Sequence, residues 1–121
     1  MEQFWEAYSE RYMASDLDAV AALYEVPFLA VREGRAIHLL DREEVRAHIA
    51  GLMEAYRSAG ASEAAIADLR VVRLDDASSI ATIRWRARSE DGAVLREFTV
   101  SYQMLRRPAG WTILSYVYHA D

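Results

Sequence analysis

The chain contains no cysteine, which excludes disulfides, thiolate nucleophiles and thiolate metal sites together, so a reducing cytoplasm is the expected compartment. No apolar run approaches the roughly 20 residues that a membrane-spanning helix needs. Residues 1–6 have neither the positive segment nor the apolar segment of a secretion signal. We therefore expect no export and no membrane partner.

Basic residues are also scarce, with 14 Lys and Arg against 19 Asp and Glu and a net charge of −5. This balance gives no positive surface for a phosphate backbone, and we expect no nucleic-acid partner. The three histidines do not cluster, and no Gly-rich phosphate loop or His-Glu-x-x-His helix is present, so we expect no metal and no cofactor. With 53% hydrophobic and 27% charged residues, the 121-residue chain is typical of one globular domain over residues 1–121.

The hydrophobic pattern changes from a helical period to an alternating period along the chain. Helical spacing covers residues 2–13, 15–24 and 41–60. In the second of these helices, Ser15 is the expected cap and Tyr24 belongs to the apolar stripe. Strand signals cover residues 28–32, 35–40, 65–74, 79–89, 93–106 and 111–119. The predicted fold class is α+β, in the order α-α-β-β-α-β-β-β-β, with three helices packed in a strongly curved mixed sheet of about six strands.

Turn chemistry gives a register for the last strands. A two-residue turn at Asp91-Gly92 pairs Trp85 with Phe98 and Arg86 with Glu97, and an equally tight turn at residues 108–110 places His119 beside Phe98. On this register Leu114, Tyr116 and Tyr118 lie on the outer face of the sheet, beside the solvated, charge-paired Arg84 and Arg86. An exposed apolar cluster commonly marks a contact surface, so we expect a homodimer through the outer sheet face.

A family resemblance rests on two segments, Tyr8…Ser15-Asp16-Leu17-Asp18…Ala22-Leu23-Tyr24 and Tyr102-Gln103-Met104-Leu105…Gly110-Trp111-Thr112-Ile113. They resemble NTF2-like proteins, including ketosteroid isomerases and SnoaL-like polyketide cyclases. The resemblance implies a cystatin-like α+β cone, that is, a bent sheet around helices with a pocket at its open end. It also implies that Tyr8 occupies the position of the oxyanion-stabilising tyrosine of the isomerases, and Arg32 that of their carboxylate base.

Arg32 argues against steroid isomerisation, because a guanidinium stays protonated and cannot act as the base. The adjacent Glu33 would point the other way on a strand. The inward positions Phe98, Val100 and Tyr102 offer no carboxylic acid as a second oxyanion donor. Asp68 and Arg70 resemble the water-activating pair of related epoxide hydrolases, but alternation places them outside, as a surface ion pair.

We predict that an aromatic pocket with a few hydroxyl and imidazole groups occupies the open end of the cone. Its expected lining is Tyr8, Tyr12, Tyr24, His38, Trp85, Phe98, Tyr102 and His119.

Three functions are compatible with this pocket. The first is a module that binds a small apolar or aromatic molecule. The second is a SnoaL-like isomerase, cyclase, dehydratase or hydrolase, with Tyr8 as hydrogen-bond donor and His119 or His38 as base. The third is an interaction domain whose cone is filled by side chains.

Overall fold

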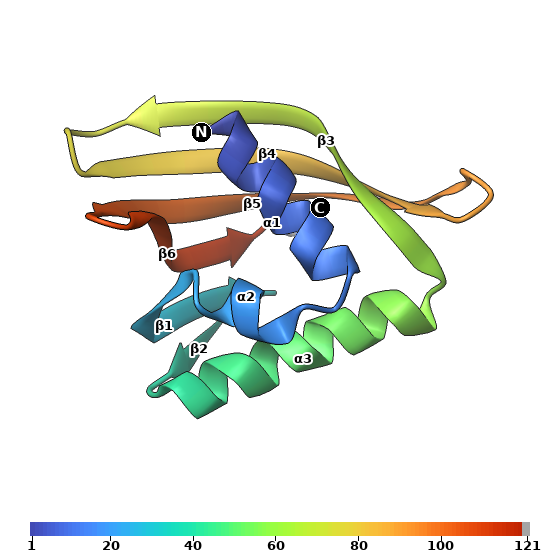
Figure 1. The fold of residues 1–121 in the computed structure, drawn as a ribbon, viewed down its shortest axis with the longest axis horizontal. Helices are drawn as coiled ribbons and strands as arrows, with labels where there is room; N and C mark the ends of the chain where they lie inside the picture. Colours follow the sequence, from blue (N-terminus) through green and yellow to red (C-terminus); the bar gives the residue numbers. More distant parts are fainter. Residues whose placement is uncertain (120–121) are drawn as a thin grey trace.

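The computed structural model describes residues 1–119, which form three helices and one six-stranded sheet (Figure 1). The helices are α1 (Glu2–Met13), α2 (Leu17–Ala21) and α3 (Arg42–Ser58). The strands are β1 (Tyr24–Arg32), β2 (Arg35–Leu39), β3 (Ala61–Arg73), β4 (Ser78–Ser89), β5 (Val94–Arg107) and β6 (Gly110–Tyr118). The element order and the α+β class are as predicted. No helix among the described residues is long and apolar enough to cross a membrane.

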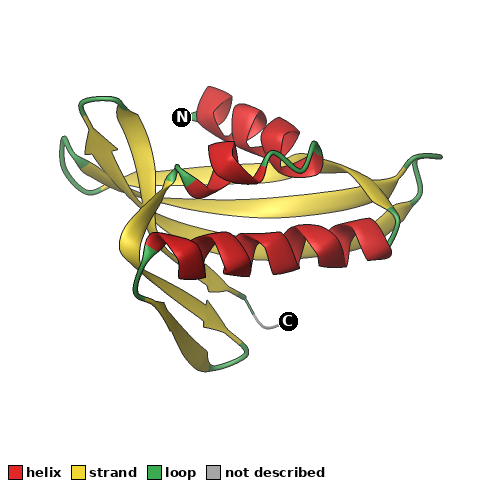
Figure 2. Cartoon of the chain, turned by 60° about the horizontal axis from the view of Figure 1, so that its bottom comes forward, coloured by secondary structure: helices red, strands yellow, loops and turns green. Residues whose placement is uncertain are grey.

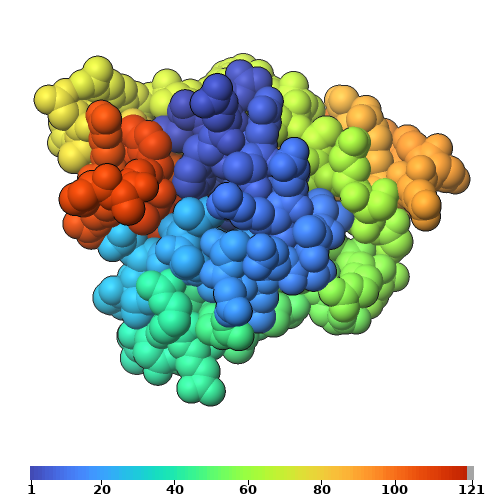
Figure 3. Space-filling model, in the orientation of Figure 1, coloured from blue at the N-terminus to red at the C-terminus, as the bar shows by residue number. Residues whose placement is uncertain are grey.

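The sheet is mixed, with strand order β2-β1-β6-β5-β4-β3. Only β1 and β6 pair in parallel, and every other neighbouring pair is antiparallel. The three helices lie on one side of this bent sheet (Figures 1 and 2). In the space-filling view, α1 and α2 cover the middle of the molecule, while the β3–β4 and β4–β5 turns project at either side (Figure 3).

The helices bury the faces that their apolar spacing predicts. Trp5, Tyr8 and Tyr12 are the buried residues of α1, and Val45, Ile49 and Met53 are those of α3. A side chain caps the beginning of α3, because Asp41 accepts a hydrogen bond from the backbone N–H of Glu44 at 2.8 Å.

Two local predictions around α2 are wrong. Asp16, rather than Ser15, caps the helix by accepting from the N–H of Ala19, because Ser15 adopts a left-handed backbone with φ 59°. Tyr24 begins β1 instead of continuing α2, since β1 pairs there with β6 opposite Ile113. Sheet pairing therefore overrides the helical spacing of Tyr24.

The predicted pairs between β4 and β5 are present: Trp85 pairs with Phe98, and Arg86 with Glu97. The predicted two-residue turn is wrong, because the Ser89 N–H donates to the Ala93 carbonyl and closes a longer turn. An extra residue at Leu95 on β5 compensates for the longer turn and restores the register. On the outer face of β3, Asp68 pairs with Arg84 and forms an exposed ion pair with Arg70. That pair is the surface contact that strand alternation indicated.

The register of β6 differs from the prediction because of an irregularity at Leu114. Met104 pairs with Ile113 but Gln103 pairs with Ser115, so Leu114 is an extra residue on β6. An extra residue sends every later side chain to the opposite face of the sheet. Tyr116 is consequently buried on the concave side, whereas Val117 is 44% exposed on the outer side. The tyrosine cluster that suggested a dimer is thus not on the outer face, and the homodimer itself stays a prediction.

Candidate functional site

A cavity of about 240 Å³ opens between α1, α3 and the concave face of the sheet. Its wall is mainly aromatic, with small alanines and two arginines. No aspartate or glutamate contributes to it among the described residues. The lining residues are Tyr8, Ser9, Tyr12, Tyr24, Arg32, Leu52, Ala55, Tyr56, Ala59, Ala61, Ala64, Trp85, Ala87, Leu95, Arg96, Phe98, Val100, Tyr102, Tyr116 and Tyr118.

Buried hydroxyl pairs line one part of the cavity. The hydroxyls of Tyr8 and Tyr24 are 2.7 Å apart, and the indole N–H of Trp85 donates to the Tyr102 hydroxyl at 2.9 Å. Burial raises the pKa of Tyr8 and of Tyr102 well above the ordinary tyrosine value, so both hydroxyls keep their protons. This part of the cavity offers polar groups without charge.

Two guanidinium groups flank a single aromatic ring elsewhere in the wall. The Arg32 guanidinium carbon is 4.4 Å from the centroid of the Tyr118 ring, and that of Arg96 is 5.3 Å from the same centroid. Arg96 also donates to the Tyr118 hydroxyl, and Arg32 donates to the Tyr116 hydroxyl at 3.3 Å. These contacts are cation–π stacking combined with hydrogen bonding to neutral groups.

His48 on α3 contacts the cavity wall from behind. Its Nε2 is 2.7 Å from the Tyr116 hydroxyl, which also accepts from Arg32. Partial burial, and then the positive charge of Arg32, lower the pKa of His48, so the imidazole is neutral at pH 7. The arrangement links a neutral imidazole to the cavity through one hydroxyl.

The structure brings most of the predicted lining residues together. Tyr8, Tyr12, Tyr24, Trp85, Phe98 and Tyr102 all border the cavity. Tyr8 and Tyr12 come from α1, Tyr24 from β1, and the remaining three from the inward positions of β4 and β5.

His38 and His119 do not border the cavity, and the expectation that they do is wrong. His38 is exposed on β2. His119 follows β6 beyond the extra residue at Leu114, so its ring turns to the outer face, where Nε2 is 2.8 Å from the Ser101 hydroxyl. Neither histidine is placed to serve as a base for a molecule in the cavity.

The sequence prediction missed Arg96, Tyr116 and Tyr118 as lining residues and His48 as their neighbour. Tyr116 and Tyr118 were assigned to the outer face because nothing at Leu114 signals a bulge. One signal for His48 was available in the sequence. His48 precedes Ile49 and so lies on the border of the apolar stripe of α3, where a side chain is partly buried.

Among residues 1–119, no group of three or more His, Cys, Asp or Glu side chains is arranged to hold a metal ion. The cavity wall offers two guanidinium groups and tyrosine hydroxyls instead, a set of hydrogen-bond donors that suits an uncharged or negatively charged molecule.

A bent mixed sheet closed over helices, with a cavity between them, defines the NTF2-like class with a cystatin-like fold. The chain belongs to the family described as NTF2-like protein (DUF6841), whose match extends over residues 1–121. No curated protein matches it in sequence.

Several solved structures share the fold. The protein Aln2 from a Streptomyces species is 21% identical with a TM-score of 0.75, the alignment covering 99% of this chain and 87% of Aln2. An NTF2-like protein with a cystatin-like fold from Novosphingobium aromaticivorans is 17% identical with a TM-score of 0.73, covering 96% of this chain and 76% of that one. An NTF2-like protein of unknown function from Shewanella oneidensis is 13% identical with a TM-score of 0.73, covering 96% of this chain and 93% of that one. At these identities the likeness establishes the fold alone.

Proposed function

We propose that this protein binds a small apolar or aromatic molecule inside the cone. The observation that carries the proposal is the open cavity of about 240 Å³ with a mainly aromatic wall. A cone filled by side chains, as a pure interaction domain would have, leaves no such space. Concave, mostly apolar pockets with a few placed polar groups are the usual form of small-molecule sites.

The size of the cavity limits the ligand. An apolar cavity of about 150 Å³ holds benzene, so 240 Å³ accommodates one or two fused rings. The Tyr8–Tyr24 pair and the Tyr102 hydroxyl supply the polar contacts that orient such a molecule.

Native mass spectrometry of the freshly purified protein tests the proposal first, because one spectrum reports any retained small molecule and the number of subunits. Calorimetric titration with naphthalene-2-carboxamide, a neutral two-ring probe, is the second measurement. Ala87 is buried in the cavity wall on β4, so Ala87→Leu reduces the space. Ala47 is exposed on α3, which makes Ala47→Leu the matched control.

Binding of one probe molecule per chain that Ala87→Leu abolishes and Ala47→Leu preserves supports the proposal. Absence of both a retained molecule and saturable binding overturns it. Binding that is equal in the two variants places the probe outside the cavity and overturns it as well.

A second candidate function is an enzyme of the SnoaL-like kind, and the bond between His48 and Tyr116 is the observation that favours it. A neutral imidazole can accept a proton that reaches it through a hydroxyl. Once native mass spectrometry identifies the retained molecule, incubation with excess of it distinguishes the two functions. Turnover that falls in His48→Gln and declines below the pKa of His48 indicates an enzyme, and an unchanged molecule indicates a binding protein.

A further inference from the structure

We propose that the ligand of this cavity is an organic carboxylate, with its carboxylate between Arg32 and Arg96 and its apolar body against the aromatic wall. The inference rests on the proposed binding function and names the chemical class of the ligand. It follows from where the two positive charges lie, what surrounds them and what else the wall contains.

The two charges lie against the same aromatic ring. Both guanidinium carbons face the Tyr118 ring, at 4.4 Å for Arg32 and 5.3 Å for Arg96. Their separation is therefore no greater than the sum of those two distances. Two like charges beside one ring repel each other, and a bound anion between them relieves that repulsion.

Neither charge is neutralised by a carboxylate among the described residues. Within residues 1–119, no carboxylate lies within ion-pair distance of Arg32 or Arg96, and no acidic residue lines the cavity. The hydrogen-bond partners of the two guanidinium groups are the neutral hydroxyls of Tyr116 and Tyr118. On a chain with net charge −5, a pair of cations with no acidic partner in the part of the chain that the structure describes favours a negatively charged ligand.

The partial burial of Arg32 also favours an anionic partner. Arg32 is half-buried at the cavity wall, and a guanidinium cannot relieve its desolvation by losing its proton. Desolvated charges in proteins are normally paired. Arg107, by comparison, donates two hydrogen bonds to the Glu25 carboxylate. Elsewhere in this chain, therefore, an arginine is paired with a carboxylate.

The rest of the wall specifies the body of the ligand. Phe98, Trp85 and Tyr56 surround the same space as the two arginines. An inorganic anion would leave these aromatic surfaces without a contact. A ligand with a flat apolar body covers them and places its carboxylate beside the two arginines. The guanidinium fork matches the planar, two-oxygen geometry of a carboxylate.

Calorimetric titration with two isosteric probes, naphthalene-2-carboxylate and naphthalene-2-carboxamide, tests the inference. They have nearly the same shape and differ in charge. We expect the carboxylate to bind at least about tenfold more tightly than the amide, as a charge-assisted hydrogen bond outweighs a neutral one.

Variants assign the effect to the two side chains. Arg32→Gln and Arg96→Gln should each weaken the carboxylate about tenfold while changing the amide by less than about twofold. Arg106→Gln is the control, because Arg106 is exposed on β5 and does not line the cavity. Arg32→Lys keeps the charge but loses the fork, and its affinity should lie between those of wild type and Arg32→Gln. Thermal unfolding of each variant verifies that it is folded.

The outcomes separate the two proposals. Equal binding of the carboxylate and the amide overturns the carboxylate inference and leaves the binding function standing. A preference for the carboxylate that persists in both glutamine variants overturns the role of the two arginines. Failure of both probes to bind, together with the absence of any retained molecule in the native mass spectrum, overturns the binding function itself.

Discussion

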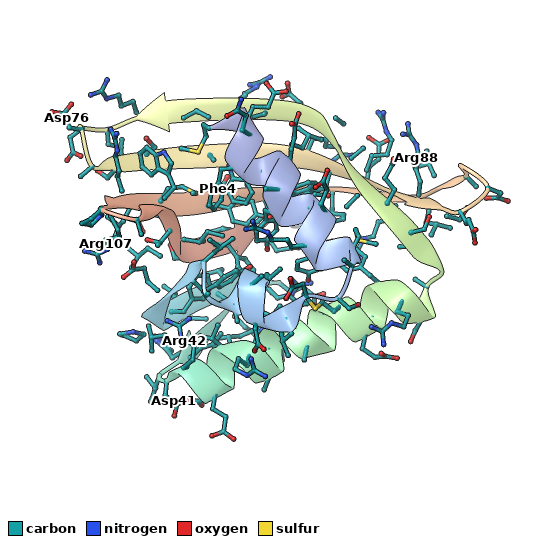
Figure 4. All side chains as sticks on the ribbon, viewed as in Figure 1. Phe4, Asp41, Arg42, Asp76, Arg88 and Arg107 are labelled. Atoms are coloured by element: carbon teal, nitrogen blue, oxygen red, sulfur yellow. The ribbon has the colours of Figure 1, made fainter. Side chains whose placement is uncertain are left out.

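Replacing Glu25 by glutamine should destabilise the protein at neutral pH but not at low pH. Glu25 on β1 accepts two hydrogen bonds from Arg107, at 2.8 and 3.0 Å, and one from the Thr112 hydroxyl at 2.6 Å. It thereby joins β1 to the end of β5 and to β6. Arg107 and Arg42 lie on the same side of the molecule (Figure 4).

The magnitude follows from the pKa of Glu25. The hydrogen bonds from Arg107 and Thr112 lower this pKa from 4.5 to about 2. Without screening, such a difference corresponds to about 3 kcal/mol of folding free energy. The Arg107 side chain is 52% exposed, so solvent screening reduces the contribution to about 1–2 kcal/mol. Because the carboxylate form is the one that the fold favours, this stabilisation is complete above the unfolded pKa and disappears as the pH falls toward 2.

Urea unfolding of the wild type and Glu25→Gln at about pH 7, 5 and 3 measures the effect. The difference between them should be about 1–2 kcal/mol at pH 7, similar at pH 5, and less than half as large at pH 3. Glu90→Gln, in the exposed β4–β5 turn, is the control and should change the stability little at any of these values. A difference that stays constant from pH 7 to pH 3 would refute the reasoning, because only an ionised Glu25 makes these bonds at full strength.

The remaining predictions concern the buried indoles and the histidine behind the cavity. Within residues 1–119, the Nε1 of Trp5 is buried without a hydrogen-bond partner, whereas Trp85 donates to Tyr102. Trp85→Phe leaves the buried Tyr102 hydroxyl without its donor, whereas Trp5→Phe breaks no hydrogen bond among the described residues. In urea unfolding, Trp5→Phe should therefore lower the free energy of unfolding by about 1 kcal/mol less than Trp85→Phe does. An equal decrease in the two variants contradicts this. Arg32→Gln should raise the pKa of His48, because it removes a nearby positive charge; an unchanged NMR titration of the His48 ring would show that the charge has no such effect.

The sequence predicted the order of the elements because each signal was local. Four aromatics at helical spacing defined α1, and Asp41 with Glu44 marked the beginning of α3. The pairing of Trp85 with Phe98 was also predicted correctly, although the turn is longer than the expected two residues: Ser89 bonds to Ala93, and an extra residue at Leu95 restores the register. In that register, helical spacing and strand alternation are enough to predict the aromatic lining residues from α1, β4 and β5.

The tyrosines at the arginine end of the site were not predictable in the same way. Arg96 follows the alternation of Phe98 along β5. The inward positions of Tyr116 and Tyr118 instead depend on the extra residue at Leu114, an ordinary apolar residue in an apolar strand. Side-chain alternation carries no record of such an irregularity. The position of His48 against Tyr116 depends in turn on the same shift.

Because of the extra residue at Leu114, the side chains that line the cavity depend on the number of residues in β6 as much as on which amino acids β6 contains. Deleting that one position, with the pairing otherwise kept, would turn Val117 and His119 toward the cavity and expose Tyr116 and Tyr118 on the outer surface. A cationic, tyrosine-rich cavity would become one containing an imidazole, without any amino acid being replaced. Loss or gain of a single codon in this strand therefore changes which side chains border the cavity.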